Sequence, residues 1–348
     1  MRRRSDRLRR RVAGTIGAVG LVAVLSACGS IYPDLTPTNQ PFGGVRSNVR
    51  EVTIGFAQQQ VQAPYFAAMK QLADEIARKK GFKLLFQSAN KDPAIQLNQM
   101  QAMLAQGASV LIVNATSVKG QVWNMKQIGS QVPVIYVDTA VPGTGTTAVQ
   151  SNSFAIGQGA GKLAAERFKA MGKSQISMVV ITGSPTDEFV GPARRKGFLQ
   201  GLTDGGVKYT IESEQDGLYQ QDTGQVAAET MLAAHPNVDL VMGLNDAMVL
   251  GAYNVVSGNP KYRNVYVAAA ADGQREALAL IKRDGCRGRY LSTGLNSPNL
   301  ATEQALTIAI DIALGHKKPS DYPPNSYTLA VGIGCNNVDK FYDPNSVF

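Results

Sequence analysis

Histidine, cysteine and tryptophan are scarce: the 348 residues include only two histidines, three cysteines and one tryptophan. His235 and His316 are each predicted near a helix end, where a cation is favoured, so a structural role is expected. The tryptophan, Trp123, lies on an apolar helical stripe and is predicted in the core. Gly-x-Ser-x-Gly, Cys-x-x-Cys and metal-ligand spacings are missing. Nucleophilic and metal-dependent catalysis therefore have few candidates, although Asp138 or Asp272 could serve as acid or base.

Phosphate-binding loops are also missing, and no cofactor is predicted. The run GQGAGK at 157–162 has suitable glycines, but it follows no strand directly and lacks the Ser or Thr required after its lysine. The run GKS at 172–174 has no glycine five residues before it. We interpret the first run as helix packing and the second as a helix end.

Positive charge is concentrated at the N-terminus. The formal net charge is +9, but residues 1–11 contain seven arginines and a single acid, Asp6. The rest of the chain has 28 basic and 25 acidic residues, so it is nearly neutral. The overall charge is therefore no sign of nucleic-acid binding, and no nucleic-acid partner is predicted.

The N-terminal segment has the pattern of an export signal. The arginines precede sixteen uncharged residues, 12–27, which are short of the roughly 20 needed to span a bilayer. The run LSAC at 25–28 then resembles the lipobox of bacterial lipoproteins, whose cysteine is lipidated and becomes the first residue after cleavage. We therefore expect a signal peptide over 1–27 and lipidation of Cys28. A plainly secreted protein and an uncleaved anchor are the alternatives.

Residues 28–49 are predicted to form a tether. They contain three prolines and several glycines with little apolar periodicity, which is typical of a flexible or partly extended segment. Such a segment would hold the folded part away from the membrane surface. An irregular loop packed on the folded part is the alternative.

Cys286 and Cys335 remain once Cys28 is assigned to lipid. In an oxidising exterior compartment, an isolated pair of cysteines favours a disulfide. A bridge that closes a loop of this length would stabilise the fold by roughly 4 kcal/mol if it is unstrained. Two buried free thiols are the alternative.

The stretch 52–75 combines a strand, a loop and a helix. Residues 52–56 form a β-branched and aromatic run, and apolar side chains recur at helical spacing from Tyr65 onward. In an open parallel sheet, such a loop is where small molecules bind. Amides and aromatic rings suit a polyhydroxylated ligand; an ordinary polar loop with core aromatics is the alternative. The side chains concerned are Gln58, Gln59, Gln60, Gln62, Tyr65 and Phe66.

Strands and helices alternate along the rest of the chain. Strands are predicted at 52–56, 83–87, 110–113, 134–137, 147–150, 176–181, 209–213, 240–243, 265–270, 289–293 and 327–333. Helices are predicted at 65–79, 93–106, 118–128, 154–171, 194–203, 221–234, 247–257, 274–283 and 298–314. This alternation predicts an α/β fold with two Rossmann-like lobes, each built on a parallel sheet.

Polar residues follow several of these strands. Asn114, Asp138, the pair 245–246 (ND) and Asp272 each come just after a predicted strand. Because the carboxyl ends of parallel strands lie at one edge of a sheet, these side chains would face a ligand. Asn and Asp also cap helices, and at any one position capping explains the residue equally well. Four such positions around one cleft favour recognition.

Several motifs carry a resemblance to a known family. They are APYF at 63–66, LIVN at 111–114, VIYVD at 134–138, RRKGF at 194–198, AAHPNVD at 233–239, NDAMVLGA at 245–252 and ADG at 271–273. With these motifs, the chain from residue 52 onward resembles the type I periplasmic sugar-binding proteins of ABC importers, in particular the ribose-binding branch. The core of that family is shared with lactose-repressor-type regulators.

The resemblance implies two lobes joined by three hinge crossings, near Ser151, Asn296 and Asn325. Lobe 1 would contain 50–151 and 297–325, and lobe 2 would contain 152–296 and 326–348. Cys286 and Cys335 would then share lobe 2, where a bridge between them would leave hinge motion free.

The resemblance also implies a set of ligand-binding residues. Rings would stack on the two faces of the ligand, and polar side chains would hold its hydroxyls. The stacking residues would be Tyr65, Phe66 and Tyr219; the polar ones would be Asp138, Arg194, Asn245, Asp272 and Asn296, with Gln59 and Asn114 as further candidates. Ala63 and Thr139 stand where the family has Asn and Arg. These two departures argue against ribose itself and leave another pentose, a hexose or a polyol.

Together these features predict a lipid-anchored solute-binding protein on the outer face of a bacterial cytoplasmic membrane. As a monomer and without enzymatic activity, it would close on a sugar or polyol and deliver it to an ABC permease with its ATPase subunit. A sugar-sensing subunit that presents its ligand to a membrane signalling partner is the alternative. A repressor would need a helix-turn-helix where this chain has an export signal, and an exported carbohydrate enzyme would need the missing catalytic groups.

Overall fold

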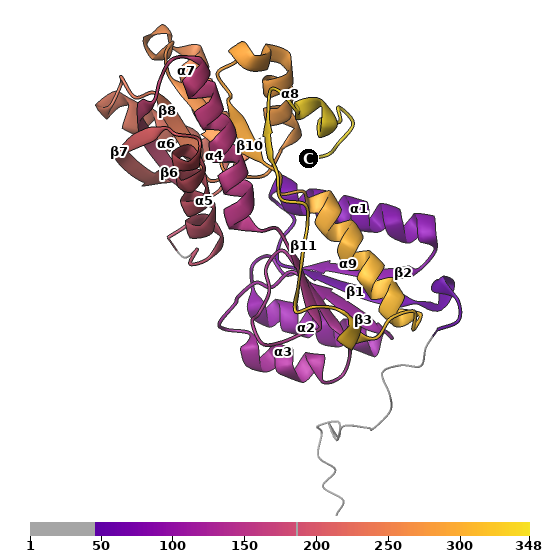
Figure 1. Cartoon of the computed structure of the whole chain (residues 1–348). Coiled ribbons are helices and arrows are strands. Elements are labelled where there is room, and N and C mark those ends of the chain that lie inside the picture. The colour runs from indigo at the N-terminus through magenta and orange to yellow at the C-terminus, as the bar shows by residue number, and fades with distance from the viewer. Residues whose placement is uncertain (1–45, 186) are drawn as a thin grey trace, which may run out of the picture. The chain divides into compact units, whose positions relative to one another are not determined.

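The computed structural model describes residues 46–185 and 187–348 of the chain (Figure 1). The expected signal peptide, Cys28 and most of the expected tether lie outside these residues. The last part of the expected tether is ordered. Asn48 accepts a hydrogen bond from Arg50 N at 3.0 Å and so caps the 3-10 turn η1 (Val49–Glu51). None of the helices in the described ranges is long and apolar enough to span a membrane.

The first sheet has six strands in the order β11-β5-β4-β3-β1-β2, and every neighbouring pair is parallel. Its strands are β1 (Thr53–Gln58), β2 (Lys83–Ser88), β3 (Val110–Val113), β4 (Val134–Val137), β5 (Thr147–Gln150) and β11 (Asn325–Tyr327). The β3 and β4 strands are uninterrupted apolar runs whose side chains are all buried, as expected for a parallel sheet covered on both faces.

Helices cover both faces of this sheet (Figure 1). They are α1 (Pro64–Lys80) and α9 (Pro298–Ala313) on one face, and α2 (Pro93–Ala105) and α3 (Val122–Gly129) on the other. Two apolar clusters correspond to the two faces. Met69 of α1 and Ala305 of α9 belong to one cluster with Ile54, whereas Met100 of α2 belongs to the other with Leu111.

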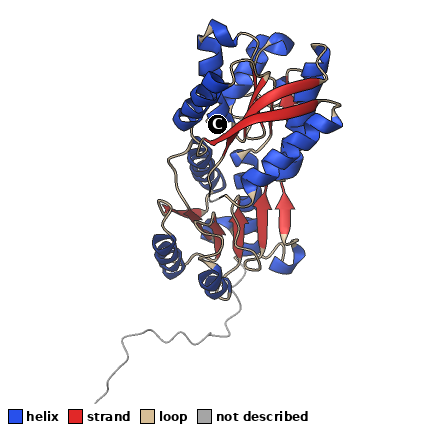
Figure 2. Ribbon diagram, turned by 90° about the vertical axis from the view of Figure 1, so that its left-hand side faces the viewer, coloured by secondary structure: helices blue, strands red, loops and turns tan. Residues whose placement is uncertain are grey.

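The second sheet has four parallel strands in the order β7-β6-β8-β9. Its strands are β6 (Gln175–Thr182), β7 (Lys208–Asp216), β8 (Leu240–Gly243) and β9 (Tyr266–Ala269). The helices around it are α4 (Ser153–Ala170), α5 (Val190–Asp204), α6 (Gln221–Ala234), α7 (Asp246–Gly258) and α8 (Arg275–Asp284). Its apolar side chains form a single buried cluster. Figure 2 shows the strands of the two sheets in red as separate groups flanked by helices.

The run 157–162 packs α4 against α5, as its interpretation from the sequence proposed. A Cβ on Gly161 would lie 2.1 Å from the carbonyl oxygen of Phe198, and one on Gly157 would lie 2.5 Å from that of Arg194. Only glycine therefore permits these helices to approach so closely. This contact also fixes the position of Arg194, which lies in the first half of α5.

The single strand predicted at 327–333 is wrong. Residues 325–327 form β11 and pair with β5 in the first sheet, whereas β12 (Gly332–Gly334) pairs antiparallel with β10 (Ser292–Gly294) beside β9. Residues 328–331 connect the two sheets. The apolar run at 329–333 looks continuous in sequence, but Leu329 is 60 % exposed and the buried part begins at Gly332, where a Cβ would lie 2.4 Å from the backbone of Gly159 in α4. The chain therefore leaves the first sheet after Tyr327, two residues beyond the position near which a hinge crossing was expected, Asn325.

The prediction for Trp123 is also wrong, because its side chain is 72 % exposed. Helix α3 begins at Val122 and buries Met125 and Ile128, which are three residues apart. Each residue advances about 100° around a helix, so Trp123 points away from the stripe that these two residues define. Burial of Trp123 was predicted from the apolar residues near it in sequence, although its own position around the helix faces solvent.

Cys286 and Cys335 form a disulfide with an S–S distance of 1.93 Å and a Cα–Cα distance of 5.2 Å. Cys286 lies in the 3-10 turn η3 (Gly285–Arg287) after α8, and Cys335 directly follows β12. The bridge therefore ties the end of α8 to the returning C-terminal segment, on the side of the second sheet.

Candidate ligand-binding site

The predicted site residues come from the carboxyl ends of strands and the first turns of helices. Tyr65 and Phe66 lie in the first turn of α1, directly after Pro64 at its N-terminus. Polar residues follow the strands as predicted: Asn114 after β3, Asp138 after β4, Asn245 after β8 and Asp272 after β9. Arg194 projects from α5, and Tyr219 precedes α6.

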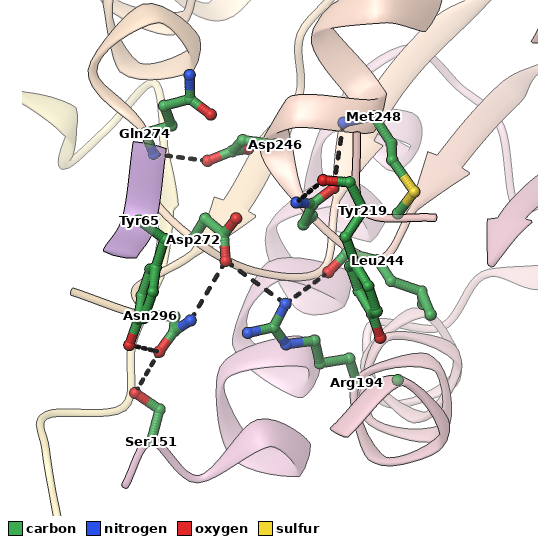
Figure 3. Close-up of polar contacts among 12 residues, drawn as sticks. Tyr65, Ser151, Arg194, Tyr219, Leu244, Asp246, Met248, Asp272, Gln274 and Asn296 are labelled. Carbon is green, nitrogen blue, oxygen red and sulfur yellow. Dashed lines mark hydrogen bonds and ion pairs between the residues drawn. The ribbon is translucent and has the colours of Figure 1, made fainter. Parts of the chain in front are cut away.

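The structure joins several of these residues in one hydrogen-bonded network (Figure 3). Arg194 Nη1 lies 3.4 Å from Asp272 Oδ1, and Asn296 Nδ2 donates to the same oxygen at 3.3 Å. Asn296 Oδ1 accepts from Tyr65 OH at 3.4 Å and from Ser151 Oγ at 2.7 Å. The network therefore joins a residue of α1, on the first sheet, to residues of the second sheet. Ser151 and Asn296 are two of the predicted hinge positions.

Burial governs the electrostatics of this network. Arg194, Asp272 and Asn296 are each exposed by 6 % or less. Burial raises the pKa of Asp272, against the opposing effects of Arg194 and Asn296. Burial alone would lower the pKa of Arg194, but Asp272 and the other nearby acidic groups raise it above its ordinary value. The guanidinium is therefore held firmly charged, and its Nε has no hydrogen-bond partner among the described residues.

Asp138 lies beside this network on the first sheet. Its carboxylate accepts from Asn114 Nδ2 at 3.3 Å and from Thr139 Oγ1 at 3.0 Å. Burial raises the pKa of Asp138. The pKa of Tyr65 is raised well above its usual value by burial, by the charges of Asp138 and Asp272, and by a hydrogen bond to Asp138. Tyr65 thus connects the two carboxylates.

Tyr219 is held in a fitted position that the sequence did not reveal. Its ring passes beside Gly183, where a Cβ would lie 2.2 Å from the ring, and its hydroxyl donates to the carboxylate of Asp187. Asp187 also accepts from Gly191 N at 2.7 Å, at the start of α5. The position of Asp187 just before α5 is the only feature of the sequence that indicates its role in holding Tyr219. Asn245 Nδ2 donates to Tyr219 O at 3.4 Å.

Asn245 also fulfils the capping alternative. Its Oδ1 accepts from Met248 N at 3.1 Å and so caps α7. The same side chain donates from Nδ2 to Tyr219 O at 3.4 Å, so it also contacts a predicted ligand-binding residue. Capping and contact with the site are therefore not exclusive at this position.

Three of the predicted residues have left-handed backbone conformations. The φ angles are 62° for Asp138, 60° for Tyr219 and 114° for Asp272. Non-glycine residues rarely adopt such angles, and each one costs about 1–3 kcal/mol. Strain of this kind persists where the surroundings impose it, and it is concentrated at functional sites. Its presence at three positions of one cluster supports a functional role for that cluster.

Phe66 and Gln59 are not part of the polar network. The Phe66 ring packs edge-on against Tyr65 with 5.3 Å between centroids, and its carbonyl oxygen accepts from Gln58 Nε2 at 2.8 Å. Gln59 contacts Lys91 through its backbone carbonyl oxygen at 2.7 Å. The structure therefore gives Phe66 a packing position beside Tyr65, and it joins no side-chain atom of Gln59 to the other candidates.

Asp246 lies behind Asp272 and was predicted only as the neighbour of Asn245. It is fully buried and accepts from Gln274 N at 2.7 Å and from Tyr290 OH at 2.5 Å. Burial and the charge of Asp272 raise its pKa to about 7. Asp246 therefore supports the loop that carries Asp272 and does not face the cleft.

A cavity of about 300 Å³ adjoins Asp272 and separates α1 from the C-terminal segment 341–348. Phe348 lies on its wall and contacts the Tyr65 ring edge-on, with 5.5 Å between centroids. No periodic pattern marks this terminal segment, so the sequence did not reveal its contact with Tyr65. In the described ranges, no group of three or more His, Cys, Asp or Glu side chains could hold a metal ion.

Two parallel α/β sheets that share a buried polar cluster, with strained backbone at the strand ends, define a binding protein of the two-lobed α/β class. The sequence profile of the periplasmic binding protein domain matches residues 54–317. The chain therefore belongs to this family, as one of its type I sugar-binding proteins, and its relatives include ribose import binding proteins and the HTH-type transcriptional repressor PurR.

Named relatives agree with this assignment. The chain is 28 % identical to the ribose import binding protein of Bacillus subtilis over 84 % of its own length and 90 % of the relative. It is similar to the structure of an ABC transporter solute-binding protein from Mycobacterium smegmatis with bound glycerol, with a TM-score of 0.73, 26 % identity and 85 % and 98 % of the chains covered. The chain is also similar to the structure of the Caulobacter myo-inositol binding protein bound to myo-inositol, with a TM-score of 0.69 and 26 % identity. This match covers 85 % of the present chain and 97 % of the other.

Proposed function

We propose that this protein is an extracytoplasmic solute-binding protein of an ABC importer, which closes on a sugar or polyol and delivers it to a permease. The single observation that carries the proposal is the network in which Arg194, Asp272 and Asn296 meet Tyr65. A carboxylate accepts from hydroxyls, a guanidinium donates to them and an amide does both. This is the set of partners that a hydroxyl-rich ligand requires.

The two sheets would move as lobes on a hinge. The proposed crossings are at Ser151, at Asn296 and at 328–331, where the chain passes between the sheets. Ser151 Oγ contacts both Asn296 and Thr328, with 3.0 Å to Thr328 Oγ1. The three crossings are therefore bonded to one another, which would keep the hinge aligned while the cleft opens and closes.

The ligand is proposed to be small and rich in hydroxyls. The relatives bind ribose, glycerol and myo-inositol according to their names and titles. Tyr65 and Tyr219 would pack on the C–H faces of such a molecule, while Asp138, Asp272 and Arg194 would bind its hydroxyls. A micromolar affinity requires about 8 kcal/mol, which a few charge-assisted hydrogen bonds in a desolvated cleft supply.

A thermal-shift screen of the full-length protein in mild detergent tests this function. The ligands would be pentoses, hexoses, cyclitols and linear polyols. Because ligand binds only the folded state, a hundredfold excess over its dissociation constant should raise the free energy of unfolding by about 2.7 kcal/mol. Unrelated amino acids and carboxylic acids are the control ligands. Stabilisation by these controls but by no hydroxylated compound would contradict the proposal, and turnover of a bound sugar would indicate an enzyme.

We propose in addition that Cys28 anchors the protein to the outer face of the cytoplasmic membrane. Expression in a bacterium with lipoprotein processing should place the protein in the membrane fraction and incorporate labelled fatty acid. Cys28→Ser should release it into the soluble fraction and abolish the label. The double variant Cys286→Ser, Cys335→Ser is the control, because it retains only Cys28 and should still be labelled. A labelled Cys28→Ser protein would refute this anchor.

A further inference from the structure

The ionisable side chains of the proposed site do not balance in charge. Asp272 accepts from Asn296, which in turn accepts from Tyr65 OH, and the charges of Asp138 and Asp272 both raise the pKa of Tyr65. Arg194 lowers the pKa of both carboxylates, and the one ion pair that either of them makes among the described residues joins Arg194 to Asp272. The site therefore contains two carboxylates and one guanidinium. Asp246, which is buried behind Asp272, is not included in this count.

Arg194 is committed to Asp272 and to the second sheet. Its Nη1 lies 3.4 Å from Asp272 Oδ1 and donates to Leu244 O at 3.3 Å. Among the described residues, Asp138 Oδ2 accepts hydrogen bonds only from neutral donors, namely Asn114 Nδ2 and Thr139 Oγ1. Asp138 is therefore the carboxylate whose charge has no direct counterion among the described residues, and it is only partly exposed to water.

Two buried hydrogen-bond acceptors at the carboxyl ends of β1 and β3 have no partner among the described residues; with Asp138, which follows β4 in the same sheet, they form what is called here the Asp138 wall. Asn114 is fully buried, and its Nδ2 is used by Val137 O and Asp138, which leaves Oδ1 without a partner. Gln58 is also fully buried; its Nε2 donates to Phe66 O, and its Oε1 has no partner. Because each NH₂ faces oxygen atoms, the oxygen and nitrogen assignments of both amides are settled by their neighbours. The two residues end the adjacent strands β1 and β3.

We propose that the ligand of this site is a polyhydroxylated amine, either an amino sugar or an amino polyol, whose ammonium group binds against Asp138. This inference rests on the function proposed above and specifies its substrate class. The ligand hydroxyls are held by Asp272, Arg194 and Asn296. The ammonium supplies what the Asp138 wall lacks, since it carries three donors, no acceptor and one positive charge.

An ammonium group suits this wall better than a hydroxyl does. Charge-assisted hydrogen bonds are roughly twice as strong as neutral ones, and the attraction grows where water is excluded. A neutral hydroxyl would leave the charge of Asp138 uncompensated on closure, whereas an ammonium would cancel it.

Matched ligand pairs measure this preference directly in the full-length protein in detergent. The pairs are glucosamine and glucose, galactosamine and galactose, 1-amino-1-deoxysorbitol and sorbitol, and 2-amino-1,3-propanediol and glycerol. Titration calorimetry near pH 7, where these amines are largely protonated, should give at least about tenfold tighter binding for the amine in each pair that binds, since one additional charge-assisted contact is worth about that factor.

Three variants test whether the charge of Asp138 sets this preference. Asp138→Asn removes the charge and should reduce the amine preference to about threefold or less. Thr139→Arg places a guanidinium beside Asp138 and should reverse the preference, whereas Thr139→Val removes only a neutral donor and should retain it. If neutral partners bind as tightly as the amines, this inference is overturned and the proposed function stands. If no hydroxylated compound of either series binds, the proposed function fails together with it.

Discussion

Replacing Arg194 with alanine should abolish ligand-induced stabilisation and reduce affinity for any ligand of the wild-type protein at least about hundredfold. Arg194 is 6 % exposed and is bonded to Asp272 and to Leu244 O. Removal of one partner from a buried, hydrogen-bonded charge pair typically costs 2–5 kcal/mol in binding, because the other charge remains unpaired. Calorimetry at a temperature where both proteins are folded measures this loss.

The same substitution should lower the free energy of unfolding of the unliganded protein by about 3 kcal/mol near neutral pH. The loss should become smaller as the pH falls, because burial raises the pKa of Asp272 and a protonated carboxyl needs no counterion. Arg194→Lys separates folding from binding: it retains the charge but loses the planar fork, so it should fold and bind about tenfold more weakly. Full ligand response in both variants would place the site elsewhere.

Arg195→Ala is the matched control on the same helix. Arg195 pairs with Glu214 at the surface, where both side chains are about one third exposed. Exposed ion pairs contribute about 0–1 kcal/mol, so this variant should bind ligand normally and unfold within about 1 kcal/mol of the wild type. A loss of binding in Arg195→Ala equal to that in Arg194→Ala would indicate a general effect on α5.

The sequence predicted the site residues wherever a local pattern carried the information. Asn114, Asp138 and Asp272 each follow a buried strand, and parallel pairing brings the ends of strands together regardless of their distance in sequence. The β3 and β4 strands were predicted with their observed bounds because fully buried parallel strands are short, continuous apolar runs. The strand pattern was therefore enough to predict where these polar residues lie in the fold, without any knowledge of side-chain contacts.

The residues that the sequence did not reveal depend on contacts between distant segments. Asp187 and Tyr219 are 32 residues apart, and only the close passage of the ring beside Gly183 makes them meet. Phe348 contacts Tyr65 across most of the chain length. Neither contact produces a periodicity or a spacing. The error at 327–333 has the same origin, because two short strands in different sheets look like one strand when only their hydrophobicity is seen.

Asp246 should make the protein less stable as the pH rises through the neutral range. Burial, with the charge of Asp272, raises its pKa from 3.8 to about 7. The folded protein therefore retains this proton over a range in which the unfolded chain has lost it, so the stabilisation is lost as pH increases toward the folded-state pKa. From about pH 5 to about pH 8, the free energy of unfolding should fall by about 3 kcal/mol from this group alone.

Asp246→Asn isolates this effect because an amide imitates the protonated acid. Its oxygen can accept from Gln274 N while its NH₂ donates to Tyr290 OH, so both contacts are retained. Urea unfolding at the two pH values should show that the wild type loses about 3 kcal/mol more than the variant. Asp284→Asn is the control: Arg283 lowers the pKa of Asp284, so its contribution has the opposite sign and is confined to acidic solution. Equal pH dependence in the wild type and Asp246→Asn would mean that Asp246 is ionised throughout, which would require a counterion for it in the folded protein.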